Sequence, residues 1–247
     1  MAEFCMEIAG HRTAVSSVFD STKDYCIRYL TDGVPEFSVV VTREDMEREQ
    51  QLAYEEALEE GFRPRVFTDP FLDRAVIQRK IAEQLLDRDV LLFHGSAVAV
   101  DGQGYLFAAK SGTGKSTHTR YWMEAFGSRA IMVNDDKPFL RMEEDGVKLC
   151  GAPWSGKHGL DTNIVVPLAG ICILERGEEN RIWREDPRAV LDRLLHEACA
   201  PLAKEKQPIF FRLVRRLSET VPLWKMTCRK DPLAAQVAYE AMAQRQA

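Results

Sequence analysis

The sequence lacks any long hydrophobic run and any excess of positive charge. No stretch of the 247 residues approaches the roughly 18 apolar residues that a membrane-spanning helix needs. Lys and Arg together number 33 against 38 for Asp and Glu, which gives a formal net charge of −5. The short basic stretches at 212–216 and 225–230 are interrupted by apolar residues. Neither a nucleic acid nor an anionic membrane surface is therefore expected as a partner.

Neither a Cys-x-x-Cys pair nor the pattern of a signal peptide is found in the sequence. The six cysteines are scattered along the chain, and no Cys-x-x-Cys pair occurs. Residues 1–10 include Glu3 and Glu7 and do not show the basic-then-apolar pattern of a signal peptide. We therefore expect reduced, structural cysteines and a cytoplasmic protein. The chain shows no internal repeat and no low-complexity linker, so we expect one large domain with a smaller appendage.

The first 70 residues are predicted to form a β-rich subdomain that packs on the core of the protein. Three short strands are expected at 4–8, 26–30 and 37–41, with a turn at Asp32-Gly33. Thr42 is placed to cap a helix that runs to Glu60. The remaining residues, 71–247, are predicted to form the main domain.

Three Asp-Pro pairs each predict the start of a helix. These pairs are Asp69-Pro70, Asp186-Pro187 and Asp231-Pro232. Asp is a favourable N-cap and Pro is favourable at the first helical position, so each pair predicts a helix start. Apolar residues recur at helical spacing after each pair, which predicts helices that pack on a core.

The centre of the sequence predicts a mixed sheet. Strands are expected at 90–94, 97–100 and 105–109, and the turn at 101–104 pairs the last two of them antiparallel. A helix, a strand at 131–134 and a hairpin of 139–142 with 147–150 follow. Residues 164–174 are strongly apolar but contain Pro167, which predicts an edge or bent strand. The predicted class is α/β, with a mixed, largely antiparallel sheet flanked by helices.

A phosphate-binding loop is predicted between the strand at 105–109 and the following helix. The segment 109–117 reads A-K-S-G-T-G-K-S-T, which fits the pattern G-x-x-x-x-G-K-[ST] except that Ala109 replaces the first glycine. Glycines allow consecutive N–H groups to face a phosphate, and the helix start attracts the same anion. The lysine would neutralise the β- and γ-phosphates, and the hydroxyl after it would bind Mg²⁺. The nucleotide-binding residues predicted in this way are Ser111, Gly112, Thr113, Gly114, Lys115, Ser116 and Thr117. The alternative is an ordinary strand-to-helix turn.

A pair of carboxylates follows the next strand. Asp135 and Asp136 lie at the carboxyl end of the strand at 131–134, the edge where open α/β sheets bind ligands. One carboxylate can hold Mg²⁺ while the other accepts the proton of an attacking hydroxyl. We assign Asp136 and Ser116 as ligands of the metal ion and Asp135 as the group that accepts the proton, although the roles of the two aspartates can be exchanged. A solvated turn is the alternative. His94 after an apolar strand is either a structural histidine or a third member of the site.

These residues resemble a known family. His94-Gly95, the hairpin that follows, the loop at 111–116 and Asn134-Asp135-Asp136 resemble the catalytic domain of HPr kinase/phosphorylase, which shares its fold with ATP-dependent phosphoenolpyruvate carboxykinase. The resemblance covers residues 88–175. It implies ATP as phosphate donor, Mg²⁺ as cofactor, an aspartate pair that contacts the metal and the acceptor serine, and a histidine that supports the phosphates and the aspartate pair. The loop that this family uses for phosphorolysis has no match here, so reversal is not implied.

The broader set of HPr-kinase-like proteins found beside genes for modified peptides resembles the chain further. The shared segments are the loop at 110–117, Pro153-Trp154-Ser155-Gly156-Lys157, and Asn163 to Leu168. Trp154 and Lys157 thus lie in a shaped loop that is expected to close over the phosphates or the acceptor. A structural turn with a buried Trp is the alternative.

The sequence therefore predicts a kinase with catalytic residues His94, Lys115, Asp135 and Asp136. The expected acceptor is a hydroxyl, in a serine of a peptide or protein or in a small metabolite such as free serine. A nucleotide-dependent switch or scaffold ATPase is the alternative from another class. Oligomeric state, including a homo-oligomer, and the choice between ATP, GTP and another donor are left open.

Overall fold

The computed structural model describes residues 2–59, 61–110 and 112–244, with the backbone alone for Lys157. It divides into two compact units, Met1–Leu85 and Leu86–Ala247. The first unit extends beyond the subdomain predicted over residues 1–70 because helix α3 is tied to its strands. The carboxylate of Asp73 on α3 is fully buried and accepts hydrogen bonds from Ser17 Oγ at 2.6 Å and Thr22 Oγ1 at 2.5 Å. The packing of this unit on the other stays a prediction.

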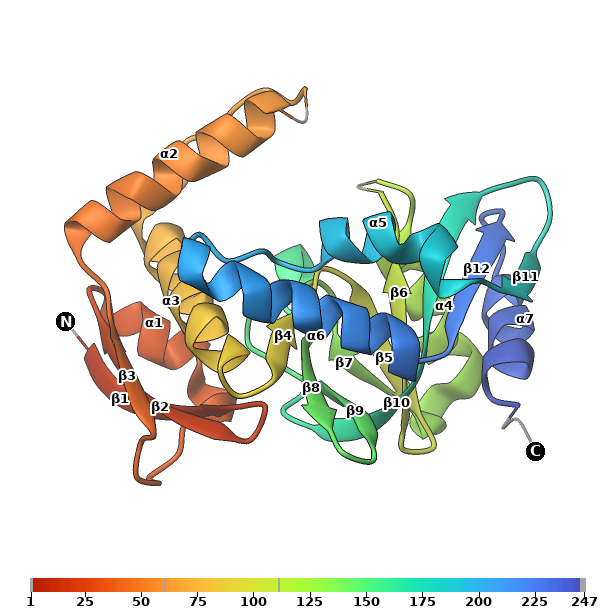
Figure 1. The fold of residues 1–247 in the computed structure, drawn as a ribbon, viewed down its shortest axis with the longest axis horizontal. Helices are drawn as coiled ribbons and strands as arrows, with labels where there is room; N and C mark the ends of the chain where they lie inside the picture. The colour runs from red at the N-terminus through yellow and green to blue at the C-terminus, as the bar shows by residue number, and fades with distance from the viewer. Residues whose placement is uncertain (1, 60, 111, 245–247) are drawn as a thin grey trace. The chain divides into compact units, whose positions relative to one another are not determined.

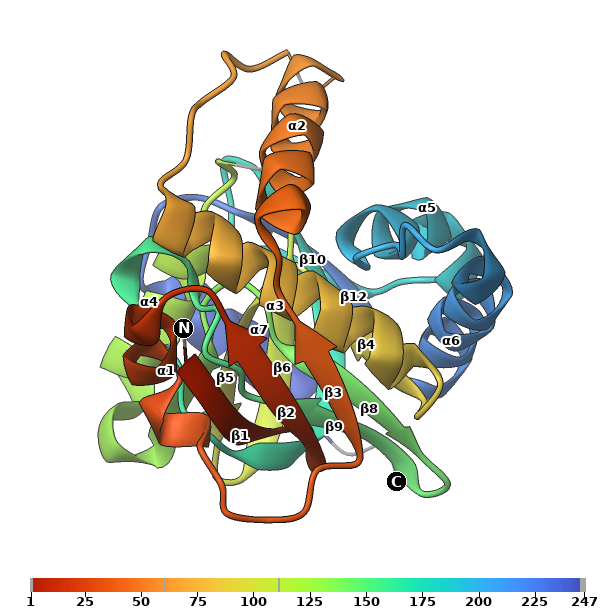
Figure 2. The same ribbon diagram turned by 90° about the vertical axis from the view of Figure 1, so that its left-hand side faces the viewer.

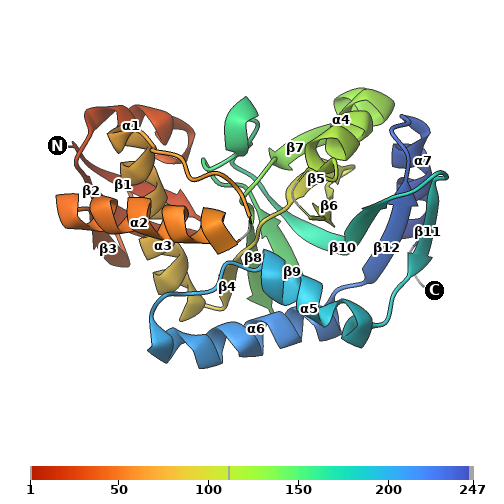
Figure 3. The same ribbon diagram turned by 90° about the horizontal axis from the view of Figure 1, so that it is seen from above.

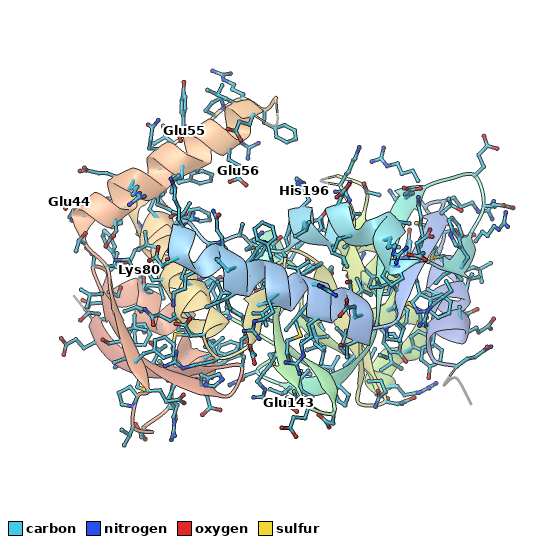
Figure 4. All side chains as sticks on the ribbon, viewed as in Figure 1. Glu44, Glu55, Glu56, Lys80, Glu143 and His196 are labelled. Atoms are coloured by element: carbon cyan, nitrogen blue, oxygen red, sulfur yellow. The ribbon has the colours of Figure 1, made fainter. Side chains whose placement is uncertain are left out.

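The first unit is a three-stranded sheet with helices (Figures 1 and 2). In the order β1-β2-β3, β1 and β2 pair antiparallel, and β2 and β3 pair parallel. Thr42 caps α2 as predicted, because Asp45 N donates to Thr42 Oγ1 and Thr42 N donates to Asp45 Oδ2. Glu44, Glu55 and Glu56 project from α2 into solvent (Figure 4). The elements are β1 (Ala2–Ile8), β2 (His11–Ser17), α1 (Asp20–Tyr25), η1 (Ile27–Tyr29), β3 (Phe37–Val40), α2 (Arg43–Glu59) and α3 (Asp69–Leu86).

The prediction of a strand at 26–30 is wrong. This segment forms the 3₁₀ turn η1, which continues from α1, because Cys26 N donates to the carbonyl groups of Thr22 and Lys23. Cys26 and Tyr29, three residues apart, are both 1% exposed. Burial at a spacing of three fits a helical turn and not the period of two of a strand.

The second unit is an α/β layer structure, and the predicted fold class is confirmed. Its described residues form a nine-stranded sheet in the order β4-β8-β9-β10-β6-β5-β7, with β12 paired to β10 and β11 to β12. Within this sheet β10 pairs parallel with β6 and β12, and the other pairings are antiparallel. The elements are β4 (Val90–Leu92), β5 (Ser96–Val100), β6 (Gln103–Ala108), α4 (Lys115–Phe126), η2 (Gly127–Arg129), β7 (Ala130–Asn134), β8 (Phe139–Glu143), β9 (Gly146–Cys150), η3 (Gly156–His158), β10 (Val165–Arg176), β11 (Arg181–Arg184), α5 (Pro187–Glu197), η4 (Lys204–Lys206), α6 (Gln207–Thr220), β12 (Leu223–Cys228) and α7 (Leu233–Met242).

Two apolar cores lie on opposite faces of this sheet. One core packs Leu194 of α5 and Leu213 of α6 against strand residues such as Ile171. The other packs Trp122 of α4 and Ala238 of α7 against residues of β5, β6 and β10. Figure 3 shows α4 and α7 on one side of the strands and α5 and α6 on the other. Because helices cover both faces, the strands are held rigidly and their ends can position a site.

Strand β10 lies in the middle of the sheet, so the prediction of an edge strand at 164–174 is wrong, whereas the predicted bend is present. Pro167 pairs with Lys148 of β9 near the start of the strand. The register against β6 shifts between Leu168 and Gly170, and beyond this irregularity β12 pairs with β10. Proline, which cannot donate a ladder hydrogen bond, is thus accommodated beside an irregularity.

Candidate active site

The predicted phosphate loop joins the end of β6 to the start of α4. Gly112 and Gly114 have φ values of 75° and 119°, which side chains other than glycine adopt only with strain. Gly114 is the residue before α4, and its carbonyl accepts the first helical hydrogen bond from His118 N at 2.9 Å. The helix therefore begins at Lys115 and directs its N-terminus toward the loop. Ser111 lies outside the described residues.

Lys115 is half-buried and folds back onto the loop. Its Nζ donates to the carbonyl oxygen of Ala109 at 3.0 Å. Burial lowers the pKa of Lys115, and it outweighs the nearby charges of Glu197 and Asp136, which raise the pKa. The lysine is thus close to both carboxylates, and its hydrogen bond to the loop carbonyl can be exchanged for one to an anion. Ser116 is exposed, and Thr117 is half-buried.

Asp135 is fixed to the first turns of α4 by two hydroxyl groups. The side chain is 6% exposed, and its Oδ1 accepts from Ser96 Oγ at 2.7 Å. Ser96 Oγ lies 2.7 Å from Thr119 Oγ1, whose hydroxyl also reaches the carbonyls of Lys115 and Ser116 at 3.3 and 3.4 Å. This chain of contacts sets the position of the carboxylate relative to the phosphate loop.

Asp136 lies beside His94, and His94 lies between two carboxylates. Nε2 of His94 is 3.4 Å from Asp136 Oδ1, and Nδ1 is 3.2 Å from Glu197 Oε2. Burial raises the pKa of Asp136, but the hydrogen bond from His94 and the charges of Lys137, His94 and Lys115 together hold it below the ordinary value. Asp136 is 35% exposed, so it presents an ionised carboxylate to solvent at the rim of the loop.

Glu197 is a site residue that the sequence did not reveal. Its side chain is 2% exposed and is held by Arg193 Nη1 at 3.0 Å as well as by His94. Burial raises the pKa of Glu197, but His94, Lys115 and Arg193 outweigh it, and the net shift is downward. The end of α5 is fastened to the segment that follows β4, because His94 N donates to the Glu197 carbonyl at 2.7 Å.

One signal for Glu197 was present in the sequence. It follows Val190 by seven residues and Leu194 by three, so it lies on the buried face of the helix that Asp186-Pro187 opens. A charged residue on such a face needs a partner. Its neighbour His196 is exposed by contrast (Figure 4). The identity of the partner, His94, depends on a contact over a hundred residues of chain and could not be read from the pattern.

Asn134 joins the aspartate pair to the loop at 151–158. It is fully buried, and its Oδ1 accepts from the backbone N–H groups of Asp136 at 2.8 Å and Lys137 at 2.6 Å. Its Nδ2 donates to the carbonyls of Ala152 at 2.7 Å and Trp154 at 3.3 Å. A single amide therefore fixes both segments.

Replacing Asn134 by alanine should lower the free energy of unfolding of the protein. The change leaves buried N–H and C=O groups without partners, which costs about 1–3 kcal/mol for each unsatisfied group. Urea denaturation of the full chain measures the loss. A free energy of unfolding within about 0.5 kcal/mol of wild type, the range of ordinary surface changes, would contradict the role of Asn134 as the link.

The loop at 151–158 borders Asp136. A Cβ built on Gly156 would lie 3.2 Å from the Cβ of Asp136, and Gly156 has a φ of 65°. Trp154 is 7% exposed, and its ring packs edge-on against Phe139 with centroids 6.4 Å apart. The structure thus buries Trp154 as an anchor and places the backbone of the following turn, η3, beside the carboxylate. Lys157 belongs to η3, and its side chain lies outside the described residues.

The donor set suits a magnesium ion bound together with phosphate. Among the described residues no group of three or more His, Cys, Asp and Glu side chains is arranged to hold a metal ion. Mg²⁺ is commonly held by one or two carboxylates together with substrate phosphates and waters. The Asp136 carboxylate and the exposed Ser116 hydroxyl are oxygen ligands of the required kind.

In the described part of the chain no helix is long and apolar enough to cross a membrane.

Matches to this chain are found among solved structures. No protein-family model matches the chain, and no curated protein matches it either. Among solved structures it is similar to the Hpr(Ser) kinase/phosphatase from Coxiella burnetii, at 12% sequence identity and a TM-score of 0.38. The match covers 62% of this chain and 96% of that one. The geometry of the site itself therefore has to carry any functional proposal.

Proposed function

We propose that the protein is a Mg²⁺- and ATP-dependent kinase that transfers the γ-phosphate to a hydroxyl, in a serine of a peptide or protein. One observation carries this proposal: the phosphate loop and the aspartate pair form one connected site. Asp135 is tied to α4 through Ser96 and Thr119, and Lys115 lies near enough to Asp136 to lower its pKa. Phosphoryl transfer needs little beyond such positioning and charge neutralisation.

In this proposal each residue of the site has its own role in the transfer. The backbone N–H groups of the loop and Lys115 hold the β- and γ-phosphates, with Lys115 leaving the carbonyl of Ala109 to do so. Asp136 and Ser116 would hold Mg²⁺, which supplies charge neutralisation at the phosphates when bound. Asp135, fixed in place by Ser96, accepts the proton of the acceptor hydroxyl. His94 orients Asp136, and Glu197 orients His94. The loop at 151–158 borders the acceptor.

Glu197 should matter for transfer and not for nucleotide binding. Glu197→Gln keeps the size of the side chain and removes the charge that holds His94, so transfer should slow by about 10- to 10²-fold, the scale of a misplaced catalytic group. Steady-state kinetics should show the change in kcat with little change in the KM for ATP. His196→Gln, an exposed neighbour on α5, is the control. A lowered melting temperature with unchanged kcat would restrict Glu197 to a structural role.

The fate of the γ-phosphate tests the proposal. The full chain is incubated with Mg²⁺ and γ-labelled ATP, with a serine-containing peptide, with free serine, and without acceptor. Label on the peptide is the expected result. Label on free serine alone would make the protein a metabolite kinase. Release of inorganic phosphate, unchanged by either acceptor, would favour a nucleotide-dependent switch or scaffold and overturn the kinase.

A further inference from the structure

Lys137 directly follows the aspartate pair, in the connection from β7 to β8. Its side chain is half-buried, and among the described residues its ammonium group forms no hydrogen bond and no ion pair. The two nearest carboxylates have other partners. Asp136 pairs with His94, and Glu197 pairs with His94 and Arg193. A charge that is shielded from water without a partner is unfavourable, so an anion is expected to bind here.

The backbone on both sides of Lys137 is fixed. Lys137 N donates to Asn134 Oδ1 at 2.6 Å. Pro138 follows, and its carbonyl accepts from Phe93 N at 3.0 Å. A proline also restricts the residue before it to extended conformations. The side chain of Lys137 therefore begins at a fixed point next to Asp136.

The charge of Lys137 acts on both halves of the site. Burial raises the pKa of Asp136, and the positive charge of Lys137 is among the effects that bring it below the ordinary value. Burial lowers the pKa of Lys115, and the charge of Lys137 lowers it further. The two lysines thus lie near enough to repel each other. An anion bound between them would relieve this repulsion.

The γ-phosphate is the anion that fits this position best. Lys115 comes from the loop that holds the nucleotide phosphates, and Lys137 comes from the segment that holds the proton acceptor Asp135. A phosphoryl group that passes from the nucleotide to the acceptor moves from the first segment toward the second. In the transition state its charge is spread over three equatorial oxygens. A fixed cation beside these oxygens stabilises them without reorganisation.

We propose that Lys137 binds the γ-phosphoryl group while it is being transferred, as a second cation beside Lys115. This inference rests on the proposed function. In the step, the acceptor oxygen forms a bond to the γ-phosphorus, the bond from this phosphorus to the β–γ bridging oxygen breaks, and ADP leaves with the bonding electrons. The hydroxyl proton goes to Asp135. Lys137 keeps its own protons and donates hydrogen bonds to the equatorial oxygens.

Calorimetric titration with ADP and Mg²⁺, with and without aluminium fluoride, tests this role, because aluminium fluoride mimics the phosphoryl group in transit. Wild type is compared with Lys137→Met, which has an apolar side chain of similar length. Both proteins should bind Mg-ADP with similar affinity. Aluminium fluoride should strengthen binding in wild type, and this gain should fall by about 10²-fold or more in the variant, the scale of one lost charge-stabilising donor. An equal gain in both proteins would overturn the role of Lys137.

Steady-state transfer from ATP to the serine-containing peptide separates this role from two others. Lys137→Met should lower kcat and leave the KM values of ATP and peptide nearly unchanged. Lys137→Arg keeps the positive charge, so its kcat should exceed that of Lys137→Met by at least about tenfold. A raised KM for the peptide with unchanged kcat would show that Lys137 binds an acidic group of the acceptor instead. A rate restored by added Mg²⁺ would show that Lys137 acts only through Asp136. Either result would overturn the proposal.

Lys204→Met, at an exposed lysine of η4, is the matched control and should behave as wild type in both assays. The melting temperature of unliganded Lys137→Met should stay close to that of wild type, because no described partner of the ammonium group is lost. A lowered melting temperature together with lost Mg-ADP binding would make Lys137 a structural residue and overturn its role. If wild type itself binds Mg-ADP neither with nor without aluminium fluoride, the proposed function fails as a whole.

Discussion

Replacing Asp135 by asparagine is expected to leave Mg-ATP binding in place and to slow phosphate transfer by about 10²-fold or more, the usual scale of a lost general base. Asparagine retains an oxygen that can accept the hydrogen bond from Ser96 Oγ, so the segment should keep its position. The charge that takes up the acceptor's proton is lost. Transfer from ATP at saturating acceptor and Mg²⁺ measures the effect.

Asp136→Asn completes this test as the partner variant. It should raise the Mg²⁺ concentration needed for half-maximal rate, and added metal should partly restore the rate. Asp192→Asn, at an exposed position of α5, is the control. If Asp135→Asn shows the metal requirement and Asp136→Asn the lost rate, the two roles are exchanged. Wild-type rates in both variants would show that the two aspartates only form a turn, and they would contradict the mechanism.

Lys115→Met should abolish most of the nucleotide affinity without unfolding the protein. Burial already disfavours the charge of Lys115, so an apolar side chain of similar length should be tolerated. A ligand at 100 times its Kd stabilises a protein by about 2.7 kcal/mol. Mg-ATP should therefore raise the melting temperature of wild type and fail to raise that of the variant.

The neighbouring exposed lysine offers the control for this experiment. Lys110→Met removes a charge from the same loop. The backbone carbonyl of residue 110, which accepts a hydrogen bond from Thr113 N, is kept. This variant should retain the Mg-ATP shift. Equal shifts in wild type and Lys115→Met would show that Lys115 does not serve the phosphates.

The sequence predicted those parts of the fold that local patterns determine. The Asp-Pro pairs announced α3, α5 and α7, and the turn at 101–104 announced the antiparallel pairing of β5 and β6. Asp186 does accept from Arg188 N at 2.7 Å, as an N-cap should. These signals act within a few residues, so no tertiary contact is needed to read them.

The parts that depend on distant contacts were missed. Residues 26–30 contain enough apolar residues for a strand, but they continue the turn begun by α1. Pro167 favoured an edge, yet β12, which the sequence did not announce, pairs beyond the irregularity in β10. Glu197 meets His94 only because the end of α5 is hydrogen-bonded to the segment that follows β4. In each case a neighbour from another part of the chain decides the outcome.

The central claim is that the loop and the aspartate pair form one Mg-ATP site, and ATP titration at several Mg²⁺ concentrations tests it most directly. Calorimetry on wild type, Lys115→Met and Asp136→Asn supplies the measurement. The predicted result is saturable binding that strengthens with Mg²⁺ in wild type, is nearly absent in Lys115→Met, and strengthens only at higher Mg²⁺ concentrations in Asp136→Asn. Binding that ignores Mg²⁺ and is equal in all three proteins would contradict the claim.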